Sequence, residues 1–293
     1  MGTAPHGKKC CSPWPKMANL SMLYVIYSYL LLNKGSTVRS DKISINGGKN
    51  LRIKPLTILL IIVILSTISV GSALAYQGSC YGFYYNAAGQ YLNTGDGAFN
   101  GAIWLSNSGY AATMYWDSYT GQAYSGIVAS NPIYASDVIN RLGSDNIFYY
   151  YGHGSYGTLA LESGEPGTGI NTIVAYNGAR ALNSVNMHSR VDLVMLLACQ
   201  SGYTNASYGN LLTTSINQGA DTAVGFTNTL YTPQATYWAE QFWPNIYSQE
   251  TVGQAASNAL TATEAHFGGS PGGLDSIVID GNQNIILNPA RSG

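Results

Sequence analysis

Two mostly apolar runs constrain the fold of this 293-residue chain more than any other feature. Residues 146–151 are Asn-Ile-Phe-Tyr-Tyr-Tyr, and residues 191–197 are Val-Asp-Leu-Val-Met-Leu-Leu. Neither run alternates between polar and apolar residues, as a strand with one face in water would. Each run therefore predicts a strand that is buried on both faces, as in a parallel sheet covered by helices.

Other segments predict the elements around these two strands. We expect strands at residues 102–105, 111–116, 159–161, 222–226, 276–279 and 285–287, the last two as a hairpin around residues 280–284. We expect helices at residues 177–186, 208–217, 232–247 and 252–266. A further helix is expected from Asn131-Pro132 to Leu142, with Ser130 or Asn131 as its cap and Gly143 at its end. The alternation of strands and helices predicts an α/β fold with a mostly parallel central sheet.

The N-terminal 75 residues have the composition of a targeting segment. They hold nine of the 13 Lys and Arg residues and a single acidic residue, Asp41. Basic residues between 49 and 54 precede the apolar residues 56–70, and Ala73 and Ala75 occupy the −3 and −1 positions of a cleavage site. This pattern predicts a secretory signal peptide over residues 49–75. Residues 56–75 are also long enough to span a bilayer, so an uncleaved membrane anchor stays open.

The remaining N-terminal residues do not fit a signal peptide. Residues 1–48 are either a cytoplasmic extension with a membrane segment or sequence upstream of the true start. The expected product is secreted or extracytoplasmic, or else is attached to the membrane through residues 56–75. Its 218 residues from Tyr76 onward are enough for one domain with a sizeable core.

Composition excludes several classes of protein. With 46% hydrophobic and 9% charged residues, the chain is not a disordered acidic or basic tail. Most of its length lacks an apolar run long enough for a membrane span, and four Cys do not make a disulfide scaffold. Residues 76–293 carry 13 acidic residues against four Arg. Because such a surface repels phosphates, we expect no nucleic-acid partner.

Each of the two buried strands ends beside a residue that can perform chemistry. His153 follows the first strand, and Cys199 follows the second, 46 residues later. That spacing accommodates one right-handed crossover, which returns the chain to a parallel neighbouring strand. The carboxyl ends of parallel strands form the ligand crevice of such a sheet. We therefore predict that the imidazole and the thiol face one another at one end of the sheet.

The predicted pair has the chemistry of a cysteine nucleophile and its base. A thiol with a pKa near ~8.5 is mostly protonated at neutral pH, and a neighbouring imidazole can accept its proton during attack. His153 would then protonate the leaving amine. The N–H groups of Gly154 and Cys199 are the predicted oxyanion hole. We expect no metal and no cofactor, because the four His and four Cys show no convergent spacing.

The residues around His153 and Cys199 resemble a known family. Tyr151-Gly152-His153-Gly154 and residues 196–202, Leu-Leu-Ala-Cys-Gln-Ser-Gly, resemble the His-Gly and Ala-Cys blocks of the caspase-like (clan CD) cysteine peptidases. That clan includes caspases, legumains, gingipains, clostripain and CHAT domains; the gingipain-like, CHAT-like and legumain-like members are the nearest. The resemblance extends through residues 219–226 and the Trp-rich helix after them, and covers roughly residues 130–266.

The resemblance implies both a fold and an activity. It implies a caspase-like three-layer α/β domain over residues 131–293, preceded by a Tyr-, Gly- and Asn-rich part at residues 76–130. It also implies a His153–Cys199 dyad that cleaves peptide bonds of protein or peptide substrates without a cofactor. Many members carry an acid in place of Leu197 or Ala198, and this chain does not. The residue that it recognises in a substrate therefore stays open.

Three functions are compatible with the sequence. The first is an exported cysteine endopeptidase. The second is a catalytically silent caspase-like module for extracellular binding, which the unmatched residues 76–130 and the missing acid favour. The third is a purely structural exported domain with a disulfide between Cys80 and Cys199.

Overall fold

The computed structural model describes residues 76–87, 90–118, 132–187, 190–287 and 289. The predicted signal or anchor segment and the predicted caps Ser130 and Asn131 lie outside these residues. Within the described ranges, no helix combines the length and the apolar character that crossing a membrane requires.

The central sheet is mostly parallel, as predicted. Its strand order is β10-β9-β8-β4-β1-β2, and β3 also pairs with β1. The pairs β1–β3, β1–β4, β4–β8 and β8–β9 are parallel, whereas β2 and β10 join it antiparallel. The strands are β1 (Gln77–Ala87), β2 (Gln90–Asn93), β3 (Ala111–Ser118), β4 (Ile147–Tyr151), β8 (Leu193–Leu197), β9 (Thr222–Phe226) and β10 (Ile277–Gly281).

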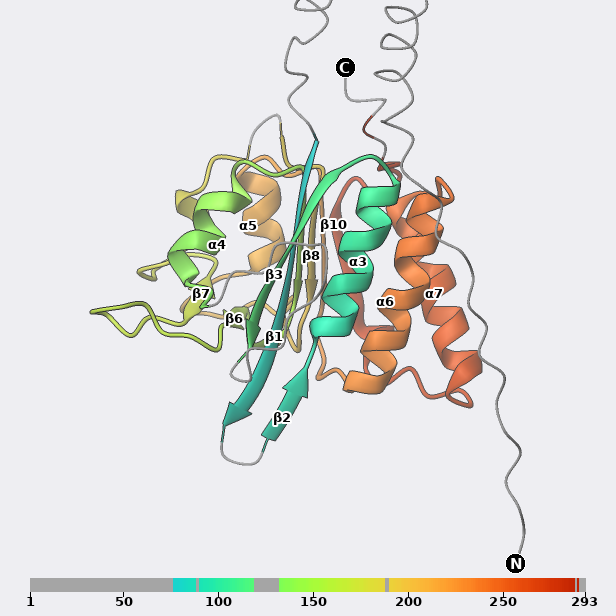
Figure 1. Cartoon of the computed structure of the whole chain (residues 1–293), viewed down its shortest axis with the longest axis horizontal. Coiled ribbons are helices and arrows are strands. Elements are labelled where there is room, and N and C mark those ends of the chain that lie inside the picture. The colour runs from blue at the N-terminus through green and yellow to red at the C-terminus, as the bar shows by residue number, and fades with distance from the viewer. Residues whose placement is uncertain (1–75, 88–89, 119–131, 188–189, 288, 290–293) are drawn as a thin grey trace, which may run out of the picture. The chain divides into compact units, whose positions relative to one another are not determined.

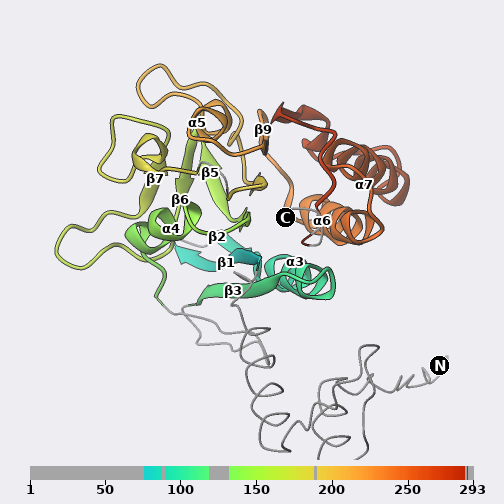
Figure 2. The same cartoon turned by 90° about the horizontal axis from the view of Figure 1, so that it is seen from above.

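Helices cover both faces of this sheet, which makes three layers (Figures 1 and 2). One face carries α3 (Gly95–Asn107), α6 (Thr232–Tyr247) and α7 (Val252–His266). The other carries α4 (Ala135–Leu142), α5 (Leu211–Asn217) and a small sheet of β5 (His153–Ser155), β6 (Thr158–Ala160) and β7 (Thr172–Val174). The mixed α/β fold predicted from the sequence is confirmed.

The two apolar runs are the fully buried strands β4 and β8. Every residue of both strands is buried. Tyr149 and Met195 belong to the hydrophobic cluster that includes α3, α6 and α7, whereas Phe148 and Val194 belong to the cluster that includes α4 and α5. The lack of alternation in the sequence follows from this arrangement, because both faces of each strand pack against helices.

The long strand β1 has different neighbours along its length. Tyr84 pairs with Ser118 of β3 and also with Asn93 of β2, so β2 and β3 lie on opposite edges of β1. Because β4 pairs with the first half of β1 only, β2 continues along the same edge beyond the end of β4. Strand β2 is thereby placed next to the residues that follow Tyr151.

The predicted strand at residues 102–105 is wrong, because these residues lie within helix α3. The helix contains three glycines, which disfavour helices by about 1 kcal/mol each relative to Ala and therefore hide the helix from sequence reasoning. Their role is packing. A Cβ atom at Gly97 would lie 2.6 Å from the ring of Tyr151, and one at Gly101 would lie 2.8 Å from the ring of Tyr149.

Two further predictions fail for local reasons. Residues 177–186 do not form an α-helix. Asn177 adopts a φ of 61°, and Val174 forms a β-bridge with Ala181, so the chain turns back on itself. Only a short 3-10 helix, Leu182–Ser184, forms in this segment. Residues 285–287 form no strand, and β10 pairs with β9 instead of forming a hairpin.

The other predicted elements match with small shifts. Helices α6 and α7 and strand β9 have their predicted limits. Helix α4 begins three residues later than predicted, at Ala135, and ends at the predicted Gly143. Helix α5 begins at Leu211, because the side chain of Asn210 accepts hydrogen bonds from the N–H groups of Leu212 and Thr213 and so caps it.

Candidate functional site

The parallel register of β4 and β8 brings His153 and Cys199 to the same end of the sheet. The last paired residues of the two strands are Tyr151 and Leu197. His153 and Cys199 each follow two residues later, and both line one cavity of about 80 Å³. The structure therefore brings together the two residues that the sequence singled out, at the carboxyl ends of adjacent parallel strands.

The walls of this cavity come from four parts of the chain. Besides the two strand ends, strand β2 and the segment from β9 into α6 contribute to it. The lining residues are Leu92, Tyr151, Gly152, His153, Leu197, Ala198, Cys199, Leu230, Thr232 and Ala235. Strand β2 reaches the cavity because it continues along β1 beyond the end of β4.

The sulfur of Cys199 lies against the backbone of Leu230. The N–H of Leu230 points at the sulfur at 3.2 Å, and the carbonyl oxygen of Leu230 lies 3.8 Å from it. A backbone N–H directed at sulfur is complementary to a thiolate, because it stabilises the negative charge. The resting contact of the thiol is thus with Leu230, and catalytic hydrogen bonds commonly tighten only when substrate binds.

The imidazole of His153 lies against an aromatic side chain. Its ring centroid is 4.3 Å from that of Tyr85, with the planes tilted by 52°. Burial lowers the pKa of His153 below its ordinary value, because the charged form loses water. The imidazole is therefore neutral at neutral pH, which is the form that accepts a proton.

Two tyrosine hydroxyls hold the backbone around His153. The Tyr150 hydroxyl lies 2.9 Å from the His153 carbonyl oxygen and also contacts the carbonyl oxygen of Ala160. The Tyr85 hydroxyl donates to the same Ala160 oxygen and lies 3.4 Å from the His153 amide nitrogen. These contacts join the start of β5 to the end of β6. Tyr85 is distant in sequence from both partners, whereas Tyr150 lies three residues before His153. Sequence reasoning missed the role of both tyrosines.

Gly154 is packed directly on the backbone of Cys199. A Cβ atom at position 154 would lie 2.6 Å from the carbonyl oxygen of Cys199 and 2.9 Å from Cβ of Ala198. No side chain fits at that distance. The backbones of Gly154 and Cys199 are therefore in direct contact, and the oxyanion role of their N–H groups stays a prediction.

The residues after Cys199 fix the end of β8. Ser201 is fully buried; its hydroxyl donates to the carbonyl oxygen of Leu196 at 2.8 Å and accepts from the N–H of Phe226 at 3.2 Å.

Gln200 has a φ of 51°, a left-handed backbone that is uncommon outside glycine. Its N–H donates to the carbonyl oxygen of Asn228 at 3.0 Å, which holds it in place. Such over-determined backbone is typical of functional sites.

Thr94 is a further residue that sequence reasoning missed. It is buried between β2 and α3, and its hydroxyl donates to the carbonyl oxygen of Tyr151 at 2.6 Å. The hydroxyl oxygen of Thr94 also accepts a hydrogen bond from the N–H of Phe83 at 2.8 Å. Thr94 therefore ties the end of β4, two residues before His153, to β1.

The predicted alternative of a Cys80–Cys199 disulfide is wrong. Both cysteines are free. Cys80 is fully buried inside β1, where it pairs in register with Met114 and Tyr149, whereas Cys199 lies beyond the end of β8. Cys80 is a core residue, and burial raises the pKa of its thiol well above the ordinary range.

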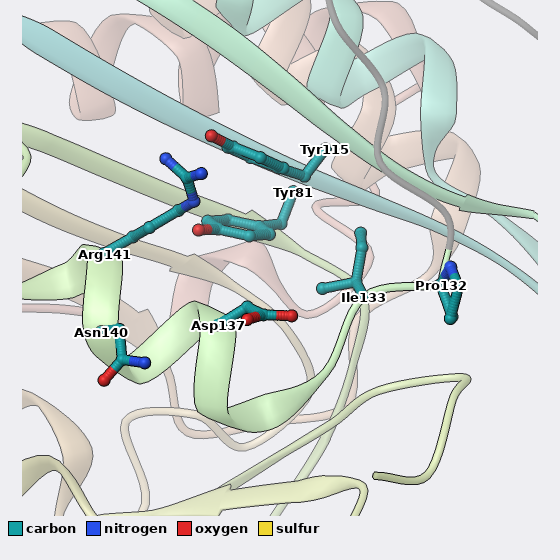
Figure 3. A pocket seen from close by; sticks show the side chains of 7 residues that line it. All are labelled: Tyr81, Tyr115, Pro132, Ile133, Asp137, Asn140 and Arg141. Atoms are coloured by element: carbon teal, nitrogen blue, oxygen red, sulfur yellow. The ribbon is translucent and has the colours of Figure 1, made fainter. Parts of the chain in front are cut away.

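A larger cavity, of about 390 Å³, lies between α4 and the strands β1 and β3 (Figure 3). The stacked rings of Tyr81 and Tyr115 are 5.0 Å apart, and the guanidinium of Arg141 lies 4.5 Å from the ring centroid of Tyr115. The cavity is lined by Tyr81, Tyr115, Pro132, Ile133, Asp137, Asn140 and Arg141. This lining includes neither a thiol nor an imidazole, whereas the lining of the smaller cavity includes both.

The sequence of this chain matches the model of a known protein family. The family model described as Peptidase family C25 matches residues 88–280, which include both strand ends and most of the central sheet. The chain belongs to peptidase family C25. It is thus a member of a family of cysteine peptidases, as the caspase-like resemblance of the sequence implied.

One solved structure has the same fold as this C25 peptidase. The Arg-specific cysteine proteinase gingipain R (RgpB) matches with a TM-score of 0.51 and 11% identity, over 72% of this chain and 47% of that chain. The chain thus spans about half the length of gingipain R. At this identity the likeness shows the fold alone.

Two further structures are similar at lower scores. A complex of Porphyromonas gingivalis RgpB pro- and mature domains has a TM-score of 0.48 and 11% identity, over 73% of this chain and 48% of that chain. Separase in the Saccharomyces cerevisiae separase–securin complex has a TM-score of 0.41 and 14% identity, over 75% of this chain and 13% of that chain. Comparison with curated protein sequences gave no match.

Proposed function

We propose that this C25 peptidase hydrolyses peptide bonds with Cys199 as nucleophile and His153 as general base and acid. The observation that carries the proposal is the register of β4 and β8, which ends both strands beside one cavity and gives it a thiol and a neutral imidazole. The family supplies the class of substrate, proteins or peptides.

The reaction follows from the chemistry of the two side chains. The thiol of Cys199 passes its proton to His153, and the sulfur attacks the carbonyl carbon of the scissile bond. The N–H groups of Gly154 and Cys199 stabilise the oxyanion that forms. His153 then returns the proton to the leaving amine, which leaves an acyl group on the sulfur. Water, deprotonated by His153, hydrolyses this thioester and restores the free thiol.

We also propose that the peptidase acts outside the cytoplasm. The support is the basic, apolar and Ala-x-Ala pattern over residues 49–75 and the segregation of charge on either side of it. N-terminal sequencing of the protein recovered from the medium or from the membrane fraction tests this. A mature start at Tyr76 supports cleavage and export. A protein found in the cytosol with residues 49–75 retained contradicts both export and anchoring.

The dyad is tested by proteolysis with matched variants. Purified full-length protein is assayed on a denatured protein substrate beside Cys199→Ala and His153→Ala. Cys80→Ala and His266→Ala are the controls: Cys80 is a core thiol, and His266 is stacked on Tyr237 at the end of α7. We expect both dyad variants to lose activity by at least about a thousandfold, and both controls to keep it.

Two results contradict the proposal. Full activity in Cys199→Ala excludes Cys199 as the nucleophile. Binding of peptide by the wild-type protein without any turnover supports the catalytically silent module instead.

A further inference from the structure

We infer that this peptidase cleaves after small uncharged residues such as Ala, Val or Thr, and that Leu92 limits the size of the residue it accepts. The inference rests on the proposed function, because it takes the cavity beside Cys199 and His153 as the pocket for the substrate side chain. That side chain belongs to the residue whose carbonyl carbon is attacked, the P1 residue. It must lie next to the sulfur, and the cavity does.

Most of the side chains that line this cavity are apolar. Its side chains beyond the dyad are mainly aliphatic, from Leu92, Leu197, Ala198, Leu230 and Ala235. Three of them, Leu197, Ala198 and Ala235, are almost completely buried, so they form a fixed floor. An apolar pocket of this kind gains free energy from aliphatic side chains and loses it on burying a charge.

No carboxylate lines this cavity among the described residues, so it offers no negative charge to pair with an Arg or Lys side chain. The carboxylate of Glu240 acts on the Tyr151 hydroxyl through space, but the Glu240 side chain is exposed on α6 and does not line the cavity. An ammonium or guanidinium in this cavity would lose water without gaining a carboxylate partner. That cost disfavours basic P1 residues.

The volume of the cavity favours a small P1 side chain. The cavity measures about 80 Å³, and a buried cavity of about 150 Å³ accommodates a benzene ring of six carbon atoms. About half that volume holds roughly three non-hydrogen atoms. Ala, Val and Thr side chains fit, whereas Phe, Tyr and Trp do not.

Leu92 is the wall residue that a substitution can change with least effect on the core. It is partly exposed on β2, whereas Leu197 and Ala235 are buried. Its neighbour Tyr91 is 71% exposed and does not line the cavity, so Tyr91→Ala is a matched control on the same strand. Glu240→Gln is the control for the nearby charge.

The test measures kcat/KM for a peptide series that varies only at P1, using the full-length protein and Cys199→Ala. We expect Ala, Val and Thr to be cleaved at least about 100-fold better than Arg, Lys or Phe. Leu92→Ala should raise kcat/KM for Leu and Met at P1 relative to Ala by about 10-fold. Tyr91→Ala and Glu240→Gln should leave the preference unchanged. Labelling of Cys199 by peptidyl acyloxymethyl ketones with Ala or Arg at P1 should show the same order.

The outcomes separate this inference from the proposed function. Cleavage that needs Cys199 but prefers Arg, Lys or Phe overturns the inference and keeps the dyad. A preference for Arg that is lost in Glu240→Gln also overturns the inference and keeps the dyad, and it assigns the specificity to Glu240. Cleavage independent of Cys199, or neither cleavage nor labelling, overturns the proposed function and the inference with it.

Discussion

The backbone of Gly154 and the carbonyl oxygen of Cys199 are so close that a Cβ atom at position 154 would lie 2.6 Å from that oxygen. Real Cβ atoms do not approach an oxygen this closely, so glycine is required where β5 passes the end of β8. The position of Cys199, the predicted nucleophile, thus requires glycine at position 154, directly after the predicted base His153. The two motifs, 46 residues apart in sequence, are sterically interlocked.

Gly154→Ala should therefore displace Cys199 without removing any reactive group. We expect kcat to fall by about 100-fold, since a displacement of about 1 Å in a reacting group has an effect of that size. Ser155→Ala, an exposed residue one position later, is the control and should retain full kcat. Steady-state kinetics on one peptide substrate measure both. An unchanged kcat in Gly154→Ala would show that the contact does not position the thiol.

The aromatic contact on His153 predicts the acid side of the pH profile. Burial lowers the pKa of His153, so the neutral base persists as the pH falls, and the acid limb of kcat/KM should lie below about pH 6.5. Tyr85→Ala should expose the imidazole to water and move the acid limb of kcat/KM to higher pH, toward pH 6.5. Tyr85→Phe keeps the ring and should leave the limb in place. A limb at the same pH in all three proteins would contradict this cause.

Thr94 should support both stability and the position of His153. Thr94→Val removes the hydroxyl and leaves the Tyr151 carbonyl and the Phe83 N–H without this buried partner, which costs about 1–3 kcal/mol. We expect that loss in denaturant unfolding, together with a fall in kcat of about 10-fold at a temperature where the variant is folded. Thr94→Ser keeps the hydroxyl and should restore most of both. Equal kcat in the two variants would limit Thr94 to a structural role.

A carboxylate at the other end of the sheet should make stability depend on pH. Burial and the nearby Asp221 raise the pKa of Asp192 to about 6. A raised pKa means that the folded state binds the proton more tightly than the unfolded state, so stability falls as the pH rises from about 4 through 6 to 7. Asp192→Asn should raise the free energy of unfolding at pH 7.5 by about 1 kcal/mol, after allowing for partial exposure. The gain should disappear at pH 4. A gain that is equal at both pH values would contradict the assignment to Asp192.

The strands that carry the site were predictable because they are local patterns. Strands β4 and β8 are both buried on both faces. The lack of alternation between polar and apolar residues in their sequences indicates this burial. The spacing of His153 and Cys199 then allowed a single crossover, and the observed parallel register of Tyr151 with Leu197 agrees with it. The placement of the two residues at one end of the sheet therefore followed from sequence and topology together.

The supporting residues were not predictable, because their partners are distant in sequence. Thr94 lies 57 positions from Tyr151, and Tyr85 lies 75 positions from Ala160. Helix α3 was hidden for a related reason: Gly97 and Gly101 disfavour a helix locally but allow it to pack on tyrosine rings of β4. Only the tertiary packing makes that glycine content an advantage.

The most direct test of the dyad is the alkylation rate of Cys199 against pH. Full-length wild-type protein and His153→Ala are treated with iodoacetamide from pH 5.5 to 9, and the peptide that contains Cys199 is quantified by mass spectrometry. If His153 activates the thiol, wild-type Cys199 should react at least 10-fold faster than in His153→Ala at pH 6.5, and the difference should narrow toward pH 9. Equal rates in the two proteins at every pH, or an unreactive Cys199 in both, would contradict the dyad.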